Sequence, residues 1–177
     1  MDVKQRKEKQ LVLDYLMSEC YIDTYSLFGG VSDPHLHFRK ELKHLILSGE
    51  IEKAYAELEK RFSGFFKAFP EASSLLNSQI FIELVRKEEP EKALLFGRMC
   101  IQNGEDITQP NTLFLLLAYK NPEDTDILKN FLALERREKV FASIDSIIKE
   151  KLHMNRASQL EYLVRFLDLS EKMKKPE

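Results

Sequence analysis

The stretch "LVLDYLMSECYIDTYSLF" (Leu11 to Phe28) carries apolar side chains at two successive helical spacings. Its first half repeats apolar residues four apart along more than one stripe, at the pairs Leu11/Tyr15, Val12/Leu16 and Leu13/Met17. Its second half places Tyr21, Thr24, Tyr25 and Phe28 at positions i, i+3, i+4 and i+7. These patterns predict two short helices, the second ending at Gly29-Gly30. Because the first helix is apolar on several sides, we expect it to contact more than one neighbour.

Helical periodicity continues along the rest of the chain. The sequence "SDPH" predicts the next helix start, with Ser32 or Asp33 as the cap and Pro34 in the first turn. Further helices are predicted over about 51–62, 73–88, 89–103, 113–119, 127–132, 133–152 and 156–174. In the last of them we expect a buried row, formed by Leu160, Leu163, Val164, Leu167 and Met173. No segment alternates in the manner of a strand, so the predicted fold class is all-α, with antiparallel helix pairs joined by short loops.

Composition restricts the class of protein. The 177 residues are 44% apolar and 32% charged, with 27 basic and 29 acidic residues, and no long run of one sign predicts binding to nucleic acid or to an anionic membrane. The two cysteines are too few for a disulfide framework or a four-cysteine zinc site. The N-terminus lacks the apolar segment of a signal peptide, and the longest apolar run, Leu113 to Tyr119, is too short to cross a bilayer. We therefore expect a soluble protein of the cytoplasm, the nucleus or both.

Candidate catalytic groups are few. His35 and His37 lie two apart and so point in different directions on a helix, which favours surface histidines over a metal site completed by Glu41. Acidic pairs stand mainly at predicted helix starts, where they complement the helix dipole. The mixed-charge sequence "ERREK" (Glu135 to Lys139) fits either a salt-bridged surface or a face that docks a partner. We expect no enzyme activity, no cofactor and no metal.

Three segments resemble a known family. Residues 1–30 resemble the LisH motif, with Tyr15, Leu16, Tyr21, Thr24 and Phe28 on its pattern. Residues 34–104 resemble a CTLH region, with matching positions at Arg39, Ile46, Gly49, Ile51 and Ala54. Residues 105–177 are similar to a CRA region, most clearly over Leu115 to Val140. The order LisH, CTLH, CRA implies a LisH helix pair followed by an α-helical bundle in which CTLH and CRA form one module.

The resemblance implies a non-catalytic scaffold. Members of this family serve in multi-subunit RING E3 ubiquitin ligases of the GID/CTLH type, bridging catalytic and substrate-receptor subunits for ubiquitin-dependent degradation. The implied partners are subunits with LisH, CTLH or CRA modules, in homo- or hetero-oligomers, and the implied pairing residues are Leu13, Leu16, Tyr21, Thr24 and Phe28. Two other hypotheses remain: a LisH adaptor linked to the cytoskeleton or to transcription, and a metal enzyme using His35 and His37.

The chain departs from the LisH pattern at two positions. Cys20 stands where the pattern has glycine, and Tyr25 stands where it has alanine. A glycine between two helices commonly adopts the left-handed conformation, in which cysteine costs about 1 kcal/mol more. These two departures leave open whether the helix pair packs and dimerises in the manner of the family.

Overall fold

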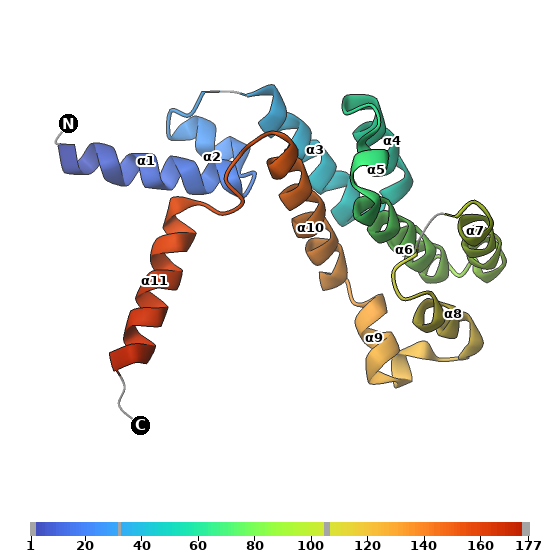
Figure 1. Cartoon of the computed structure of the whole chain (residues 1–177). Helices are drawn as coiled ribbons and strands as arrows, with labels where there is room; N and C mark the ends of the chain where they lie inside the picture. The colour runs from blue at the N-terminus through green and yellow to red at the C-terminus, as the bar shows by residue number, and fades with distance from the viewer. Residues whose placement is uncertain (1–2, 32, 105–106, 175–177) are drawn as a thin grey trace. The chain divides into compact units, whose positions relative to one another are not determined.

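The computed structural model describes residues 3–31, 33–104 and 107–174, and these contain helices and no strand (Figure 1). The first part of the chain forms α1 (Val3–Ser18), α2 (Ile22–Leu27), α3 (Pro34–Ser48), α4 (Ile51–Arg61) and α5 (Phe65–Ala68). The middle forms α6 (Pro70–Arg86), α7 (Pro90–Gln102), α8 (Pro110–Ala118) and the 3-10 turn η1 (Pro122–Asp124). The last part forms α9 (Asp126–Leu132), α10 (Glu135–Lys151) and α11 (Gln159–Lys174). The predicted all-α fold class is confirmed.

Proline and capping residues set several helix starts. Asp33 Oδ1 accepts a hydrogen bond from the His35 backbone N–H at 2.8 Å, so Asp33 caps α3, while Ser32 lies outside the described residues. Pro70 begins α6, so the predicted start near Ser73 was wrong. Proline suits the first turn because its missing N–H would have no partner there.

The chain divides into two compact units. Unit 1 comprises residues 1–41 and 148–177, and unit 2 comprises residues 42–147. The helices α3 and α10 each have residues in both units. The predicted limits of the LisH, CTLH and CRA regions rest on motifs rather than on contacts, and they stay predictions.

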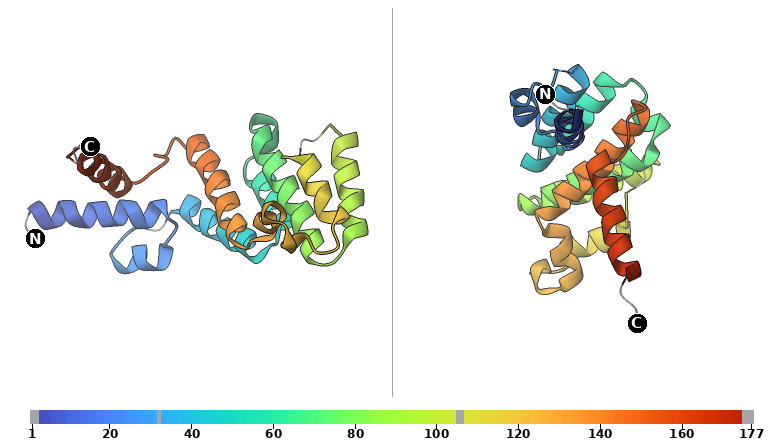
Figure 2. Two further views of the ribbon diagram at one scale, coloured as in Figure 1. Left: turned by 90° about the horizontal axis from the view of Figure 1, so that it is seen from below. Right: turned by 90° about the vertical axis from the view of Figure 1, so that its left-hand side faces the viewer.

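Unit 2 packs around α6. This helix contacts α4, α5, α7, α8 and α9, and these helices lie close together in the views of Figure 2. One core cluster contains Ile107, which precedes α8, and residues of α6 to α9: Phe81, Ile82, Ala93, Cys100, Leu113, Leu116, Leu128 and Phe131. Cys100 is therefore a small apolar core residue, as free cysteine commonly is.

Candidate protein-interaction surface

The turn between α1 and α2 is built on Cys20. This residue has φ +60°, in the left-handed region, and its N–H reaches the Met17 carbonyl at 3.4 Å. The Tyr21 N–H donates to the Leu16 carbonyl at 2.9 Å. The two bonds form a Schellman motif, in which glycine is the usual residue at the position of Cys20. The thiol is buried, so burial of the side chain opposes the cost of its backbone conformation.

Two basic side chains hold the C-terminal end of α1. Arg39, which is fully buried, donates to the carbonyls of Met17 at 3.2 Å and Ser18 at 2.7 Å. The Lys149 ammonium donates to Ser18 Oγ at 3.0 Å. Positive groups are favourable at this end of a helix, where carbonyls lack partners within the helix. The motif residue Arg39 therefore fixes α1.

Tyr25 is accommodated by a glycine. A Cβ atom placed on Gly30 would overlap the ring of Tyr25. The ring therefore fills space that any other residue at position 30 would occupy. Tyr25, which stands where the LisH pattern has alanine, fits because Gly30 has no side chain.

The first turn of α11 attaches to α1. Asp14 Oδ2 on α1 accepts a hydrogen bond from the Gln159 N–H at 2.7 Å. Ser158 and Glu161 form a capping box, in which the Ser158 N–H reaches Glu161 Oε2 at 2.8 Å and the Glu161 N–H reaches Ser158 Oγ at 3.2 Å. Burial, together with the charges of Tyr21, Glu19 and Glu161, raises the pKa of Tyr15 above its ordinary value. From this attachment α11 leads away from α1 (Figure 1).

Most of α11 is uncovered. Four of its polar residues, Glu161, Arg165, Asp168 and Lys172, follow one stripe at spacings of three and four, while apolar residues occupy most of the remaining circumference. We call the exposed apolar residues the α11 face: Tyr162, Leu163, Val164, Phe166, Leu167, Leu169 and Met173. Phe166 is 69% exposed and Leu167 is 59% exposed. The predicted buried row on this helix was therefore wrong for the single chain, because α1 covers only one side of its start.

A second exposed apolar group surrounds α2. Its members, here called the α2 tip, are Tyr21, Leu27, Phe28 and Val31. Leu27 is 87% exposed, so almost nothing in the chain covers it. Single exposed apolar residues are normal on a protein, but a contiguous exposed group of them is typical of an interaction site. The seven residues of the α11 face form such a group.

The five predicted LisH pairing residues fall into different environments. Leu16 is buried and Leu13 is half-buried, whereas Tyr21, Thr24 and Phe28 are exposed. Leu16 therefore belongs to the internal packing of unit 1, and a pairing role for the exposed three stays a prediction. Sequence reasoning missed most of the exposed surface, because the periodicity of α11 predicted burial without saying what would cover it.

The remaining predicted motif residues lie in unit 2. Ile46, Ile51 and Ala54 are buried, and Gly49 has φ +83°. A Cβ on Gly49 would lie 2.9 Å from Cζ of Arg137 and 3.1 Å from Glu83 Oε2. Glycine is required at this position both by the backbone conformation and by the guanidinium packed against it.

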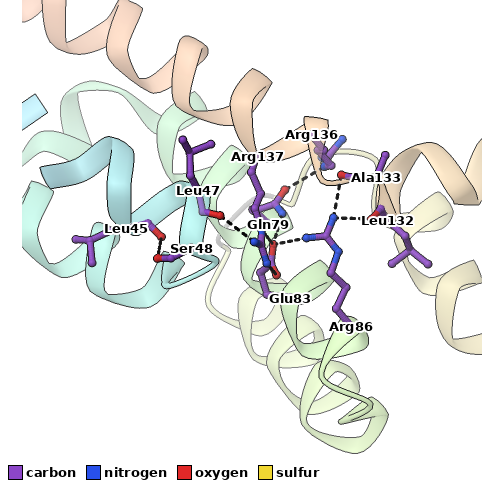
Figure 3. Close-up of polar contacts among 10 residues, drawn as sticks. All are labelled: Leu45, Leu47, Ser48, Gln79, Glu83, Arg86, Leu132, Ala133, Arg136 and Arg137. Carbon is purple, nitrogen blue, oxygen red and sulfur yellow. Dashed lines mark hydrogen bonds and ion pairs between the residues drawn. The ribbon is translucent and has the colours of Figure 1, made fainter. Parts of the chain in front are cut away.

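That guanidinium belongs to a polar cluster around Glu83, drawn in Figure 3. Arg137 donates to Glu83 at 2.6 and 2.9 Å, and Arg86 donates to it at 2.9 Å. The Gln79 amide adds a further bond to Glu83 Oε1 at 2.7 Å. Burial opposes ionisation of Glu83, but the hydrogen bonds from Arg137 and Gln79 and the charge of Arg86 outweigh it and hold the pKa below its ordinary value.

Other kinds of site were sought in the described residues. Over 3–31, 33–104 and 107–174, no three side chains of His, Cys, Asp or Glu gather in a geometry that holds a metal ion. The metal-enzyme hypothesis therefore gains no support from His35 and His37. No helix in this part of the chain is long and apolar enough to cross a membrane.

Comparison with known proteins identifies the family of the chain. Residues 36–173 match the model of the CTLH/CRA C-terminal to LisH motif domain. The chain belongs to this CTLH/CRA family. Within it, the match covers all of α4 to α10, nearly all of α3, and α11 up to Met173. The predicted family resemblance is confirmed.

Two relatives of this CTLH/CRA protein differ in how much of the chain they match. A glucose-induced degradation protein 8 homolog of Nematostella vectensis is 25% identical over 176 residues, which covers 92% of this chain and 78% of the relative. A Ran-binding protein M homolog of Arabidopsis thaliana is 33% identical over 115 residues, which covers 62% of this chain. The chain spans only 24% of the length of that second relative.

Proposed function

We propose that the protein is a non-catalytic scaffold subunit of a multi-subunit RING E3 ubiquitin ligase of the GID/CTLH type. In this role it bridges catalytic and substrate-receptor subunits, in the cytoplasm and the nucleus. Membership of the CTLH/CRA family supports the proposal, as does similarity along most of the chain to a protein named for glucose-induced degradation. The mechanism is geometric, since a scaffold that binds both kinds of subunit raises the effective concentration of substrate at the RING.

The α11 face is the observation that carries the proposal. Its width exceeds what one neighbouring helix covers, because apolar residues occupy most of its circumference. Burying a leucine or phenylalanine side chain is worth about 1.5–3 kcal/mol, so covering this face is a strong drive to associate. We propose that the corresponding surface of another LisH–CTLH–CRA module covers it, either on a second copy or on a partner subunit.

Affinity purification of the full chain from native cells tests the function. We expect a RING-bearing subunit and at least one further CTLH-containing subunit to co-purify, in amounts that Leu167→Glu reduces strongly. Arg165→Glu is the matched control, because it makes a larger change of charge on the polar stripe of the same helix. Recovery of cytoskeletal or transcription proteins without any RING subunit would contradict the ligase role.

A further inference from the structure

Two adjacent arginines, Arg136 and Arg137, lie in the first turn of α10, and the structure gives them different surroundings. The side chain of Arg137 makes three hydrogen bonds within unit 2: two reach Glu83, and Nη1 donates to the Leu47 carbonyl at 2.8 Å. Arg137 thereby joins the end of α3 to α6 within unit 2. The sequence "ERREK" was open to a structural or a docking role, and Arg137 takes the structural one.

Arg136 is held in place by two contacts, but part of its hydrogen-bonding capacity is unoccupied. Its Nε donates to Gln79 Oε1 at 3.1 Å, and its guanidinium lies over the Phe131 ring, 4.8 Å from the ring centroid (Figure 3 shows the bond to Gln79). In the part of the chain that the structure describes, no hydrogen bond or ion pair involves Nη1 or Nη2 of Arg136. Arg136 is half-buried, and both Nη atoms retain some exposure to solvent.

The cluster around Arg136 has an excess of positive charge. Arg86, Arg136 and Arg137 supply three cations, whereas Glu83 is the one carboxylate that any of them binds among the described residues. That carboxylate is already engaged by Arg86 and Arg137. Burial and the charge of Arg86 lower the pKa of Arg136, so a negative charge beside Arg136 would favour its charged form.

The acidic residues beside Arg136 on its own helix do not neutralise it. Glu135 and Glu138 are exposed, and within the described residues neither forms an ion pair. An arginine held by its Nε and an aromatic ring loses little freedom when its other edge binds, which is the property of a strong interface anchor.

We propose that Arg136 anchors a carboxylate side chain of a partner subunit, through a forked pair of hydrogen bonds from its two Nη groups. The inference rests on the proposed function, because the occupant belongs to a subunit of the ligase. One open guanidinium edge matches one carboxylate in geometry. Phosphoryl groups are typically recognised by several arginines together, and here Arg86 and Arg137 are already engaged.

The test compares charge variants of the full chain. Affinity of each purified variant for the co-purifying subunit is measured by calorimetry at two salt concentrations. We expect Arg136→Glu to weaken binding at least about tenfold and to reduce its salt dependence, and Arg136→Lys, which keeps charge but loses the fork, to weaken it less. Lys139→Glu, the same charge change at an exposed site three residues on, should alter binding less than about twofold.

Cross-linking identifies the carboxylate directly. In the Arg136→Lys variant a carbodiimide should join the new amine to one Asp or Glu of the partner. Replacing that residue by arginine should weaken binding to the unchanged chain and restore binding to Arg136→Glu. Circular dichroism and thermal unfolding of each variant exclude loss of the fold as the cause.

Three outcomes would overturn the inference. They are equal binding by Arg136→Glu and the unchanged chain, a cross-link only to acidic residues of the chain itself, and loss of the Arg136-dependent binding after phosphatase treatment of the partner. Failure of the proposed function has a different signature, because no RING-bearing subunit would then co-purify even with the unchanged chain.

Discussion

Unit 2 and unit 1 differ in where they place their apolar side chains. Unit 2 buries an apolar core against α6, although Leu95, Ile127 and Leu134 are exposed. Its buried carboxylate Glu83 is bound by Arg86, Arg137 and Gln79. Unit 1 buries basic groups that hold the end of α1, yet it leaves the α11 face and the α2 tip uncovered. Unit 2 therefore has a substantial core within one chain, whereas in unit 1 the largest uncovered apolar surface follows a single helix, and we propose that association covers it.

The largest difference in unfolding free energy is expected between substitutions of two phenylalanines, one in each unit. Phe81→Ala in the core of unit 2 should lower the free energy of unfolding by about 3–5 kcal/mol, because it removes a fully buried ring. Phe166→Ala on the α11 face should change it by less than about 0.5 kcal/mol. Urea unfolding at a concentration where the chain is monomeric measures both. Similar losses in the two variants would mean that α11 is packed in the single chain.

The next largest change in unfolding free energy is expected in the polar cluster of unit 2. Glu83→Gln leaves Arg86 and Arg137 without their anion and should cost about 3 kcal/mol at neutral pH. Because the folded pKa of Glu83 is lowered, its contribution is present above the unfolded pKa and is lost as the pH falls through the folded pKa. The advantage of the unchanged chain over Glu83→Gln should therefore begin to fall at about pH 4.5, the ordinary pKa of glutamate, and continue to fall as the pH drops further. A constant difference in unfolding free energy down to pH 2 would contradict this account of the cluster.

In unit 1, a substitution at the contact between Tyr25 and Gly30 should produce a smaller loss of stability. Gly30→Ala should destabilise the chain by about 1–3 kcal/mol, since the new methyl group overlaps the Tyr25 ring. In a Tyr25→Ala background the same change should cost much less, so a double-mutant cycle should show coupling. Additive losses in thermal unfolding would show that the two positions do not compensate each other.

The smallest effect concerns Cys20. Cys20→Ala and Cys20→Gly both remove the buried thiol, but only glycine relieves the left-handed conformation. Cys20→Gly should therefore be about 1 kcal/mol more stable than Cys20→Ala. Denaturant unfolding of the two variants measures this difference directly, and equal stability would show that the turn relaxes when the thiol is absent.

The sequence predicted the helices better than it predicted their surroundings. The spacing of Tyr21, Thr24 and Phe28 located α2, and Pro34 located the start of α3, because both signals are local. Gly49 was recognised as a motif position, but its contact with Arg137 joins residues far apart in the chain and has no local signature. Periodicity identified the apolar residues of α11, yet it carries no information on whether the same chain or another chain covers them.

The central claim is that unit 1 is completed by association through the α11 face. Sedimentation equilibrium of the full chain, of Leu167→Glu and of Arg165→Glu at micromolar concentration tests it most directly. We predict that the unchanged chain and Arg165→Glu sediment at twice the mass of one chain or more, whereas Leu167→Glu sediments as a folded monomer. An oligomer that Leu167→Glu leaves intact would contradict the claim, and so would an unchanged chain that is monomeric alone and binds the co-purifying subunits no better than Leu167→Glu does.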